Sequence, residues 1–263
     1  MIVEQIWTGN DYRNFNYLIA CPETGEALAI DPLAHEQCLA TAKAHGWEIT
    51  QILNTHEHFD HTGGNAALAA ATGARILAHA NARDRIADVA RGLVAGDVIE
   101  VGRTVELLAL DTPGHTMSHI CLLSKTEQPA LFCGDTLFNA GAGNCHHGGH
   151  PEHLYHTFAE QLARLDERTL IYPGHDYIAN NLRFTLDREP DNAAARELLS
   201  RTEHQDPAHA LVSTLALEKE INTFFRLHSP MVIARLREAF PELGESPDPQ
   251  TVFLKLRELR NSW

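Results

Sequence analysis

The sequence contains no apolar stretch near the roughly 20 residues that a membrane-spanning helix needs. It is also poor in basic residues: Lys and Arg number 21 against 35 Asp and Glu, which gives a formal net charge of −14. A nucleic-acid-binding protein normally presents a basic face. We therefore expect neither a membrane protein nor a protein whose partner is a nucleic acid.

Cysteine is scarce as well, and its positions form no CxxC pair. The five cysteines are Cys21, Cys38, Cys121, Cys133 and Cys145. Secreted chains more often carry an even set that closes as disulfides, so we expect a reducing compartment. The first 20 residues have neither the basic start nor the apolar run of a signal peptide. These features predict a cytoplasmic protein and leave its oligomeric state open.

Histidine, by contrast, is abundant, with 17 residues. Four candidate metal ligands, His56, His58, Asp60 and His61, fall within the segment NTHEHFDHTGGN. Imidazole and carboxylate groups bind zinc, iron and manganese. Alternate side chains of an extended segment share a face, so His56 and His58 can hold one ion together. Asp60 and His61 are adjacent and point in different directions, which allows a second ion.

The alternation of short apolar runs and turns predicts a mixed α/β structure for the first part of the chain. We expect strands at 1–7, 16–20, 27–31, 49–54, 75–79, 105–110, 119–124, 130–135 and 169–174. Helices are expected at 34–46, 65–73 and 150–165.

From residue 176 onward no further strand is expected. Apolar residues recur at helical spacing in four segments, 176–189, 191–204, 230–240 and 248–260. Asp191 is the expected N-cap of the second of these helices. The change in pattern predicts an α/β domain over residues 1–175 and a helical domain over residues 176–263.

Three more candidate ligands follow the ends of predicted strands. His115, Asp135 and His175 each come directly after a glycine, which permits a sharp turn. Ligand sites gather at the strand ends of α/β structures. Seven ligands suit two ions about 3.5–4 Å apart, with three ligands for each ion and Asp135 as a bridge. The spacing alone leaves the division of the ligands open.

These motifs resemble a known family. THEHFDH is similar to the HxHxDH signature of the metallo-β-lactamase fold, and TPGHT, FCGDTLF and YPGHDY resemble the later ligand motifs of that superfamily, in the same order. GDTLF together with YPGHDYIANNLRFTLDREPDN and a helical tail resembles the glyoxalase II (hydroxyacylglutathione hydrolase) branch. The resemblance extends over nearly the whole chain.

The resemblance implies an αββα sandwich followed by a helical C-terminal domain. It implies two divalent metal ions, with zinc preferred and iron or manganese as alternatives. One ion would be held by His56, His58 and His115 and the other by Asp60, His61 and His175, with Asp135 as the bridge. The implied reaction is hydrolysis of S-lactoylglutathione to glutathione and lactate. In that chemistry Asp60 and Asp135 belong to the catalytic centre, because the metals supply the hydroxide that attacks the thioester.

The resemblance also implies contacts with the glutathione carrier. Tyr177 matches a tyrosine that contacts glutathione in the family, and Arg257 and Arg260 match two C-terminal basic residues. Guanidinium groups suit a carrier that bears carboxylates, although without the resemblance both arginines would be assigned to a solvated helix face. Asn144 and His146 stand where the family usually has a basic residue and an aromatic one. That departure leaves another thiol carrier as an alternative.

Other polar residues are expected to have structural roles. His79 and His119 lack a preceding glycine and are not counted as ligands, and Glu57 is expected to point away from the metals. Cys133 lies in an apolar run and is expected to be a buried, inert thiol. The His-rich run at 145–156 is expected to be a polar loop leading into a helix, with a third metal site as the alternative.

Four other functions remain as alternatives to the thioester hydrolase. One is a persulfide dioxygenase of the same fold, which uses a single iron held by two His and one Asp. A second is a hydrolase acting on lactones or β-lactams. A nuclease is disfavoured by the charge of −14, and a non-catalytic metal-binding module would need neither open coordination positions nor a carrier-binding tail.

Overall fold

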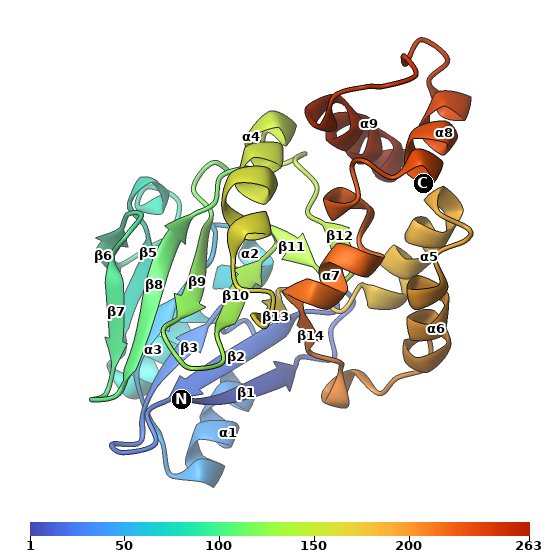
Figure 1. The fold of residues 1–263 in the computed structure, drawn as a ribbon. Helices are drawn as coiled ribbons and strands as arrows, with labels where there is room; N and C mark the ends of the chain where they lie inside the picture. The colour runs from blue at the N-terminus through green and yellow to red at the C-terminus, as the bar shows by residue number, and fades with distance from the viewer.

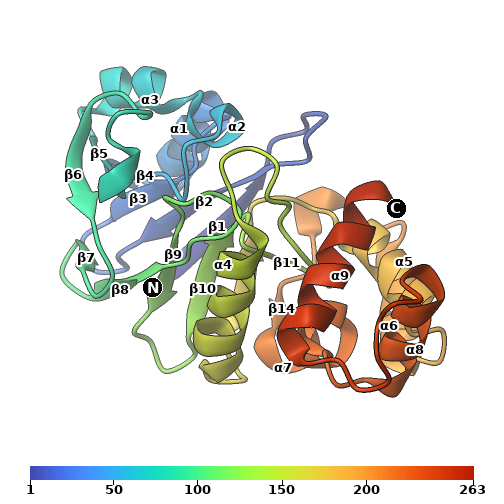
Figure 2. The same cartoon turned by 90° about the horizontal axis from the view of Figure 1, so that it is seen from above.

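Two six-stranded sheets pack face to face and carry helices on their outer faces, as the computed structural model of residues 1–263 shows (Figures 1 and 2). The first sheet has the order β1 (Ile2–Trp7), β2 (Phe15–Ala20), β3 (Glu26–Ile30), β4 (Glu48–Leu53), β5 (Arg75–His79) and β6 (Val89–Leu93). The second has the order β14 (Ser213–Thr214), β13 (Leu170–Pro173), β10 (Ala130–Gly134), β9 (Ile120–Ser124), β8 (Val105–Asp111) and β7 (Val98–Val101). The expected αββα sandwich is confirmed.

The strand directions explain why functional residues gather at one edge. In the first sheet β3, β4, β5 and β6 are parallel to one another. In the second, β8 and β10 are both antiparallel to β9 and therefore run in the same direction, and β13 is parallel to β10. The carboxyl ends of β8, β10 and β13 consequently meet at the same edge of their sheet.

Apolar side chains fill three layers around the sheets. One buried cluster lies between the two sheets and includes Phe15, Ile30 and Phe132. A second joins the first sheet to α1 (His35–His45) and α3 (Asn65–Thr72). The strands with buried neighbours on both faces, such as β2 and β10, are apolar along most of their length, which is why they are recognisable in the sequence.

A third cluster joins the second sheet to α4 (Pro151–His156) and the C-terminal helices. The helical run that begins with α4 continues through a π turn (Thr157–Gln161) and a 3-10 turn (Leu162–Arg164). The C-terminal helices are α5 (Ile178–Arg188), α6 (Ala193–Thr202), α7 (Leu215–Ile221), α8 (Pro230–Ala239) and α9 (Pro249–Ser262). Helix α9 packs on α4 and α8 (Figure 2). No helix is both long and apolar enough to cross a membrane.

The shorter elements connect these layers. Helix α2 (Phe59–Thr62) follows β4, and β11 (Leu137–Phe138) pairs with β12 (Gly141–Ala142) in a small hairpin after β10. Three further 3-10 turns occur at Ala80–Ala82, Pro207–His209 and Thr223–Phe225.

Two expectations about the C-terminal part are wrong. Strands do not stop at residue 176, because Ser213 and Thr214 form β14 and pair with β13 at the edge of the second sheet. A two-residue strand is too short to show an alternating pattern. The N-cap of α6 is Asn192, whose side chain accepts from the amide of Ala195 at 2.9 Å, and not Asp191. The division of the chain at residue 175 stays a prediction.

Candidate metal centre

All seven predicted ligands converge at the edge where four strands end. The loop after β4 carries His56 and His58, and α2, which follows it, carries Asp60 and His61. The segments after β8, β10 and β13 carry His115, Asp135 and His175 respectively. Their ligand atoms form three overlapping clusters in which all atoms lie within 4.8 Å of one another: His56, His58 and His115; His56, His61 and Asp135; and Asp60, His61 and His175.

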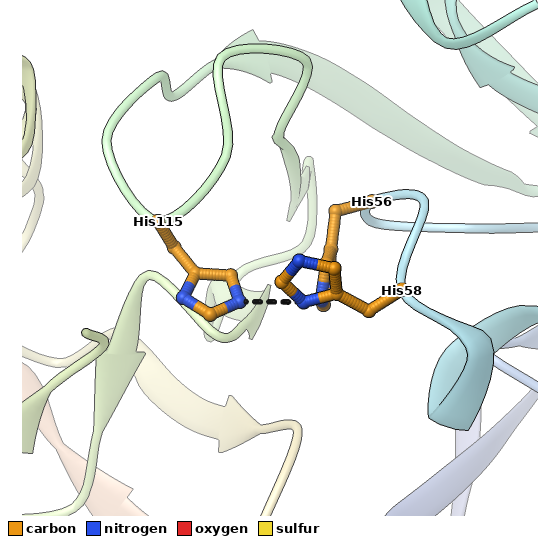
Figure 3. Close-up of side chains that lie close together, drawn as sticks. All are labelled: His56, His58 and His115. Carbon is orange, nitrogen blue, oxygen red and sulfur yellow. Dashed lines mark hydrogen bonds between the residues drawn. The ribbon is translucent and has the colours of Figure 1, made fainter. Parts of the chain in front are cut away.

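In the first cluster three imidazoles point to one spot (Figure 3). Nδ1 of His58 lies 3.1 Å from Nε2 of His56 and 3.1 Å from Nε2 of His115. A tetrahedral ion with bonds of about 2.0–2.1 Å would hold its imidazole nitrogens about 3.3 Å apart. The spacing of these three rings therefore suits one such ion.

In each of these rings, one nitrogen faces the other two rings and one faces away from them. The hydrogen bond made by the nitrogen that faces away shows that it carries the hydrogen, which leaves the other nitrogen free of hydrogen. Nε2 of His58 donates to the carbonyl of His147 at 3.1 Å, and Nδ1 of His115 donates to the carbonyl of Asn144 at 2.7 Å. The Thr55 hydroxyl donates its hydrogen to Asp31, so it accepts a hydrogen bond from Nδ1 of His56, which lies 3.0 Å away. Burial lowers the pKa of His56 well below its usual value and that of His115 to about 4. Three lone pairs thus face one another, which is unfavourable unless a cation lies between them.

The cluster of Asp60, His61 and His175, called the second cluster from here on, has the same construction but contains one carboxylate. Nε2 of His61 lies 3.2 Å from Nε2 of His175, and Oδ2 of Asp60 lies 3.6 Å and 3.5 Å from these two atoms. Nδ1 of His175 donates to the carbonyl of Tyr12 at 2.7 Å. The side-chain amide of Asn14 donates to Oδ2 of Asp60 at 3.1 Å. These bonds hold the ligand atoms of the second cluster toward a common point.

Asp135 lies between the two clusters. Its Oδ2 is 3.6 Å from Nε2 of His115 and 3.2 Å from Nε2 of His175, and its Oδ1 is 3.3 Å from Nε2 of His61. Oδ1 is buried and has no hydrogen-bond donor. Burial raises the pKa of Asp135, but His175 and His61 outweigh it and hold that pKa well below its usual value. A buried, ionised and unpartnered oxygen fits a divalent cation, as do the imidazole and carboxylate donors around it.

Two glycines make this close approach possible. Gly134 has φ +44°, a left-handed conformation, and directs the chain from β10 into Asp135. A Cβ on Gly174 would lie 2.4 Å from Oδ1 of Asp135 and 3.0 Å from Cε1 of His61. The glycines before two of the ligands are therefore required by space or by backbone conformation, as the sequence pattern suggests.

The sequence reasoning missed Asp31, which supports both clusters. Its carboxylate accepts from the amide of Thr55 at 2.8 Å, from the Thr55 hydroxyl at 2.7 Å and from Nδ1 of His61 at 3.0 Å. Asp31 follows β3 and has φ +50°. The signal that could have revealed it was the same strand-end rule, since an apolar run stops there and an aspartate follows.

The five residues expected to contact the carrier line one cavity of about 270 Å³. The cavity is lined by Phe138, Ala142, Asn144, His146, Tyr177, Asn181, Arg257, Arg260 and Asn261. The ring of Tyr177 stacks on that of His175 with 4.9 Å between the ring centres, and so connects the cavity to the second cluster. The structure therefore brings Tyr177, Asn144, His146, Arg257 and Arg260 together beside the predicted ligands.

The two arginines in this cavity have different surroundings. Arg257 is buried, and its Nη1 donates to the carbonyls of Ala142 and Gly143. Arg260 is half-buried, with Nη2 donating to Asn181 at 3.3 Å and the guanidinium over the rings of Phe184 and Trp263. Neither forms an ion pair with a carboxylate of the chain. The alternative of a freely solvated helix face does not describe Arg257.

The other polar residues lie outside the clusters. Glu57 points away from them and accepts from Arg85, Thr116 and Ser118. His119 is buried, and its Nε2 accepts from the amide of Asp135 at 3.2 Å. His79 caps the 3-10 turn at Ala80–Ala82. No cluster of three ligand groups includes a residue of the 145–156 run.

Two family models together match nearly the whole chain. The model described as metallo-beta-lactamase superfamily matches residues 15–175, and the model described as hydroxyacylglutathione hydrolase C-terminus matches residues 176–263. Among solved structures, ETHE1 from Myxococcus xanthus is 25% identical with a TM-score of 0.68, over 100% of this chain and 99% of that one.

Curated relatives match at much higher identity. The hydroxyacylglutathione hydrolase of a Polaromonas species is 73% identical and that of Nitrosococcus oceani 68% identical, each over 100% of both chains. The fold, the ligand clusters and the helical C-terminal part agree with this similarity. The chain belongs to the hydroxyacylglutathione hydrolase (glyoxalase II) family of the metallo-β-lactamase superfamily.

Proposed function

We propose that the protein is a two-metal hydrolase of glutathione thioesters, with S-lactoylglutathione as its substrate. The observation that carries this proposal is the cavity lined by Tyr177, Arg257 and Arg260 beside the ligand clusters. Glutathione bears two carboxylates, and two guanidinium groups without a carboxylate partner suit such a carrier. The high identity to full-length relatives named hydroxyacylglutathione hydrolase supports the same substrate.

The ligand assignment follows the clusters. We propose His56, His58 and His115 for one ion and Asp60, His61 and His175 for the other, with Asp135 as the bridge. Zinc is the proposed metal, with iron and manganese as alternatives, because imidazole and carboxylate accept all three. Two divalent ions bound here would supply a hydroxide at neutral pH and stabilise negative charge on the carbonyl oxygen.

The chain's own residues bind and orient the substrate in this proposal. Arg257 and Arg260 attract the carrier's carboxylates, while Asn144 and His146 form the neighbouring wall of the cavity. Tyr177, whose ring stacks on that of His175, places the carrier next to the metal ligands. The departing thiolate needs little help from a protein acid, since a thiol has a pKa of about 8.5.

The location is proposed to be the cytoplasm. All five cysteines are free, and four of them are buried. Reduced thiols suit a reducing compartment, which supports the proposal.

Hydrolysis of S-lactoylglutathione tests the function. Loss of thioester absorbance would be followed with the purified protein, and metal content would be determined on the same sample. Rapid turnover with two metals per chain is expected. If the protein hydrolyses other thioesters or lactones but not S-lactoylglutathione, the assignment of glutathione as the carrier is overturned.

Two variants sharpen this test. Asp135→Ala should lose both metal occupancy and rate, and unchanged metal content would contradict the bridging role. Arg260→Met should raise KM at least about 10-fold, since a hydrogen bond to a charged group contributes about 1.5 kcal/mol or more and about 1.4 kcal/mol is a factor of ten, with a smaller change in kcat.

A persulfide dioxygenase is the second candidate function. It would need a single iron, whereas the structure offers three ligands in each of two clusters. Oxygen uptake by a protein that binds only one iron, without thioester turnover, would favour this candidate.

A further inference from the structure

The loop between β12 and α4 supports two histidines of the first cluster through its backbone. The carbonyl of Asn144 accepts from Nδ1 of His115 at 2.7 Å, and the carbonyl of His147 accepts from Nε2 of His58 at 3.1 Å. These bonds fix which ring nitrogen carries the hydrogen and which faces the other rings of the cluster. The geometry of the first cluster therefore depends on where this loop lies.

Arg257, from helix α9, holds the start of the same loop. Its Nη1 donates to the carbonyl of Ala142 at 2.8 Å and to that of Gly143 at 3.0 Å. The side chain is only 5% exposed, and its guanidinium lies 5.5 Å from the centre of the Phe224 ring. Burial lowers the pKa of Arg257 to about 10, so the group remains a cation at neutral pH.

A guanidinium held in this way is a strong anchor. Charged donors form stronger bonds to carbonyl groups than neutral donors do, and here a single guanidinium nitrogen, Nη1, contacts two carbonyls that follow each other in the chain. Asn144 is the next residue after Gly143, so a shift of these two carbonyls moves the carbonyl that His115 contacts.

We propose that Arg257 is a positioning residue for the first metal site, acting through the backbone of residues 142–147 on His115 and His58. This inference rests on the proposed two-metal centre. It also gives Arg257 a role that Arg260 does not share, although both line the carrier cavity. A carrier carboxylate that reaches Arg257 would contact the same side chain that holds the loop.

Arg260 provides the matched control. It lies one turn further along α9 and has the same charge, but its contacts are Asn181, Phe184 and Trp263 rather than the loop. Removal of either arginine takes one positive charge from the cavity. Only removal of Arg257 takes away the support of the loop.

The experiment measures hydrogen exchange of the ligand imidazoles in the zinc-loaded full-length protein, labelled with 15N at histidine. For Arg257→Met we expect the ring N–H groups of His115 and His58 to exchange at least 10-fold faster. The N–H groups of His61 and His175 are internal references, because they donate to Asp31 and to the Tyr12 carbonyl. Titration with a chelator should show that Arg257→Met binds one of its two zinc ions about 10-fold to 100-fold more weakly than the wild type does.

Arg260→Met should leave both exchange rates and both zinc affinities as in the wild type, whatever it does to KM. The proposal is overturned if Arg257→Met leaves the exchange of His115 and His58 unchanged, or if all four ring N–H groups accelerate together. Equal effects of the two arginine variants would overturn it as well. If Arg257→Met does not fold, Arg257→Gln decides, since its shorter side chain ends before the carbonyls of Ala142 and Gly143: faster exchange at His115 and His58 supports the proposal, and unchanged exchange overturns it.

A failure of the proposed function would look different. A wild-type protein that binds fewer than two zinc ions would contradict the two-metal centre itself. A wild type with two zinc ions and unchanged exchange in Arg257→Met would contradict only the positioning role.

Discussion

The carboxylate of Asp31 accepts a hydrogen bond from Nδ1 of His61 at 3.0 Å, and both side chains are buried. In the neutral imidazole this bond places the hydrogen on Nδ1 and leaves Nε2 of His61 free and directed at the second cluster. The same carboxylate accepts from the amide and the hydroxyl of Thr55, which precedes His56. Asp31 thus orients His61, a ligand of the second cluster, and also holds Thr55, the residue before His56 of the first cluster.

The first prediction concerns this carboxylate. In Asp31→Asn the side chain keeps its size but loses one acceptor and its charge, and three donors then compete for one oxygen. Such partners of ligating histidines change metal affinity by about 10-fold to 100-fold, so we expect one zinc ion to bind that much more weakly. Chelator titration of the variant measures the effect. Asp84→Asn, at an exposed position, is the control; equal zinc affinities in both variants would contradict the role of Asp31.

Asp31 also shows how far the sequence could lead. Ligands are recognisable because imidazole and carboxylate groups recur at strand ends, and all seven predicted ligands lie in the clusters. Asp31 stands at a strand end too, but the number of ligands that two ions need gave no reason to include it. Its role depends on contact with His61, thirty positions away in the chain, and only the fold brings these residues together.

The fold was predictable where burial is uniform. The strands β2 and β10 have apolar runs and were expected. In β6 the residues Ala90, Arg91 and Gly92 are not buried, and no apolar pattern marks that strand. The two residues of β14 are held by pairing with β13, not by their own preference. Edge strands that depend on a neighbour leave little trace in the sequence.

A second prediction follows from the space around Gly174. A Cβ there would meet Oδ1 of Asp135 at 2.4 Å, and the backbone cannot shift freely because it bonds to Gly134 and Phe15 on both sides. In Gly174→Ala we expect Asp135 to be displaced, with bound metal falling below two ions per chain. Metal analysis after dialysis gives the result. Gly244→Ala is the control, since its Cβ would meet no atom within 4 Å; full metal content in Gly174→Ala would show that the site tolerates the methyl group.

A third prediction concerns pH and the buried Glu189. Its carboxylate accepts from Arg226 at 2.5 and 3.0 Å and also from Ser229. Burial raises the pKa of Glu189, but these hydrogen bonds outweigh it and lower the pKa below 4.5. Because the folded-state pKa is lowered, the stabilisation is present at neutral pH and is lost as the pH falls from 4.5 through the folded-state value.

Glu189→Gln should therefore be less stable than the wild type at pH 7 by about 2 kcal/mol, because an amide cannot accept from both arms of the guanidinium. The difference should shrink in acid, where the wild type loses its own charge. Denaturant unfolding at pH 7 and below pH 4 measures both values. Glu238→Gln removes an exposed ion pair to Arg235 and should cost less than about 1 kcal/mol. A gap for Glu189→Gln that stays constant with pH would contradict the ionic origin of the effect.

The last prediction is that metal ions stabilise the fold through the clusters. Without cations, Nδ1 of His58 lies 3.1 Å from Nε2 of His56 and 3.1 Å from Nε2 of His115, and Oδ1 of Asp135 is buried without a donor. Zinc that binds only the folded state adds about 4 kcal/mol for each site at 1,000 times its dissociation constant. For a chain of this size such a gain corresponds to a rise in Tm of about 10 °C.

Thermal unfolding with and without excess chelator measures this gain, and zinc returned to the stripped protein should restore it. The His56→Ala variant separates specific from general effects, because it lacks a ligand of the first cluster but keeps the second. Its Tm should respond to zinc by about half as much as that of the wild type. An equal response in both proteins would mean that zinc stabilises the chain at some place other than the first cluster.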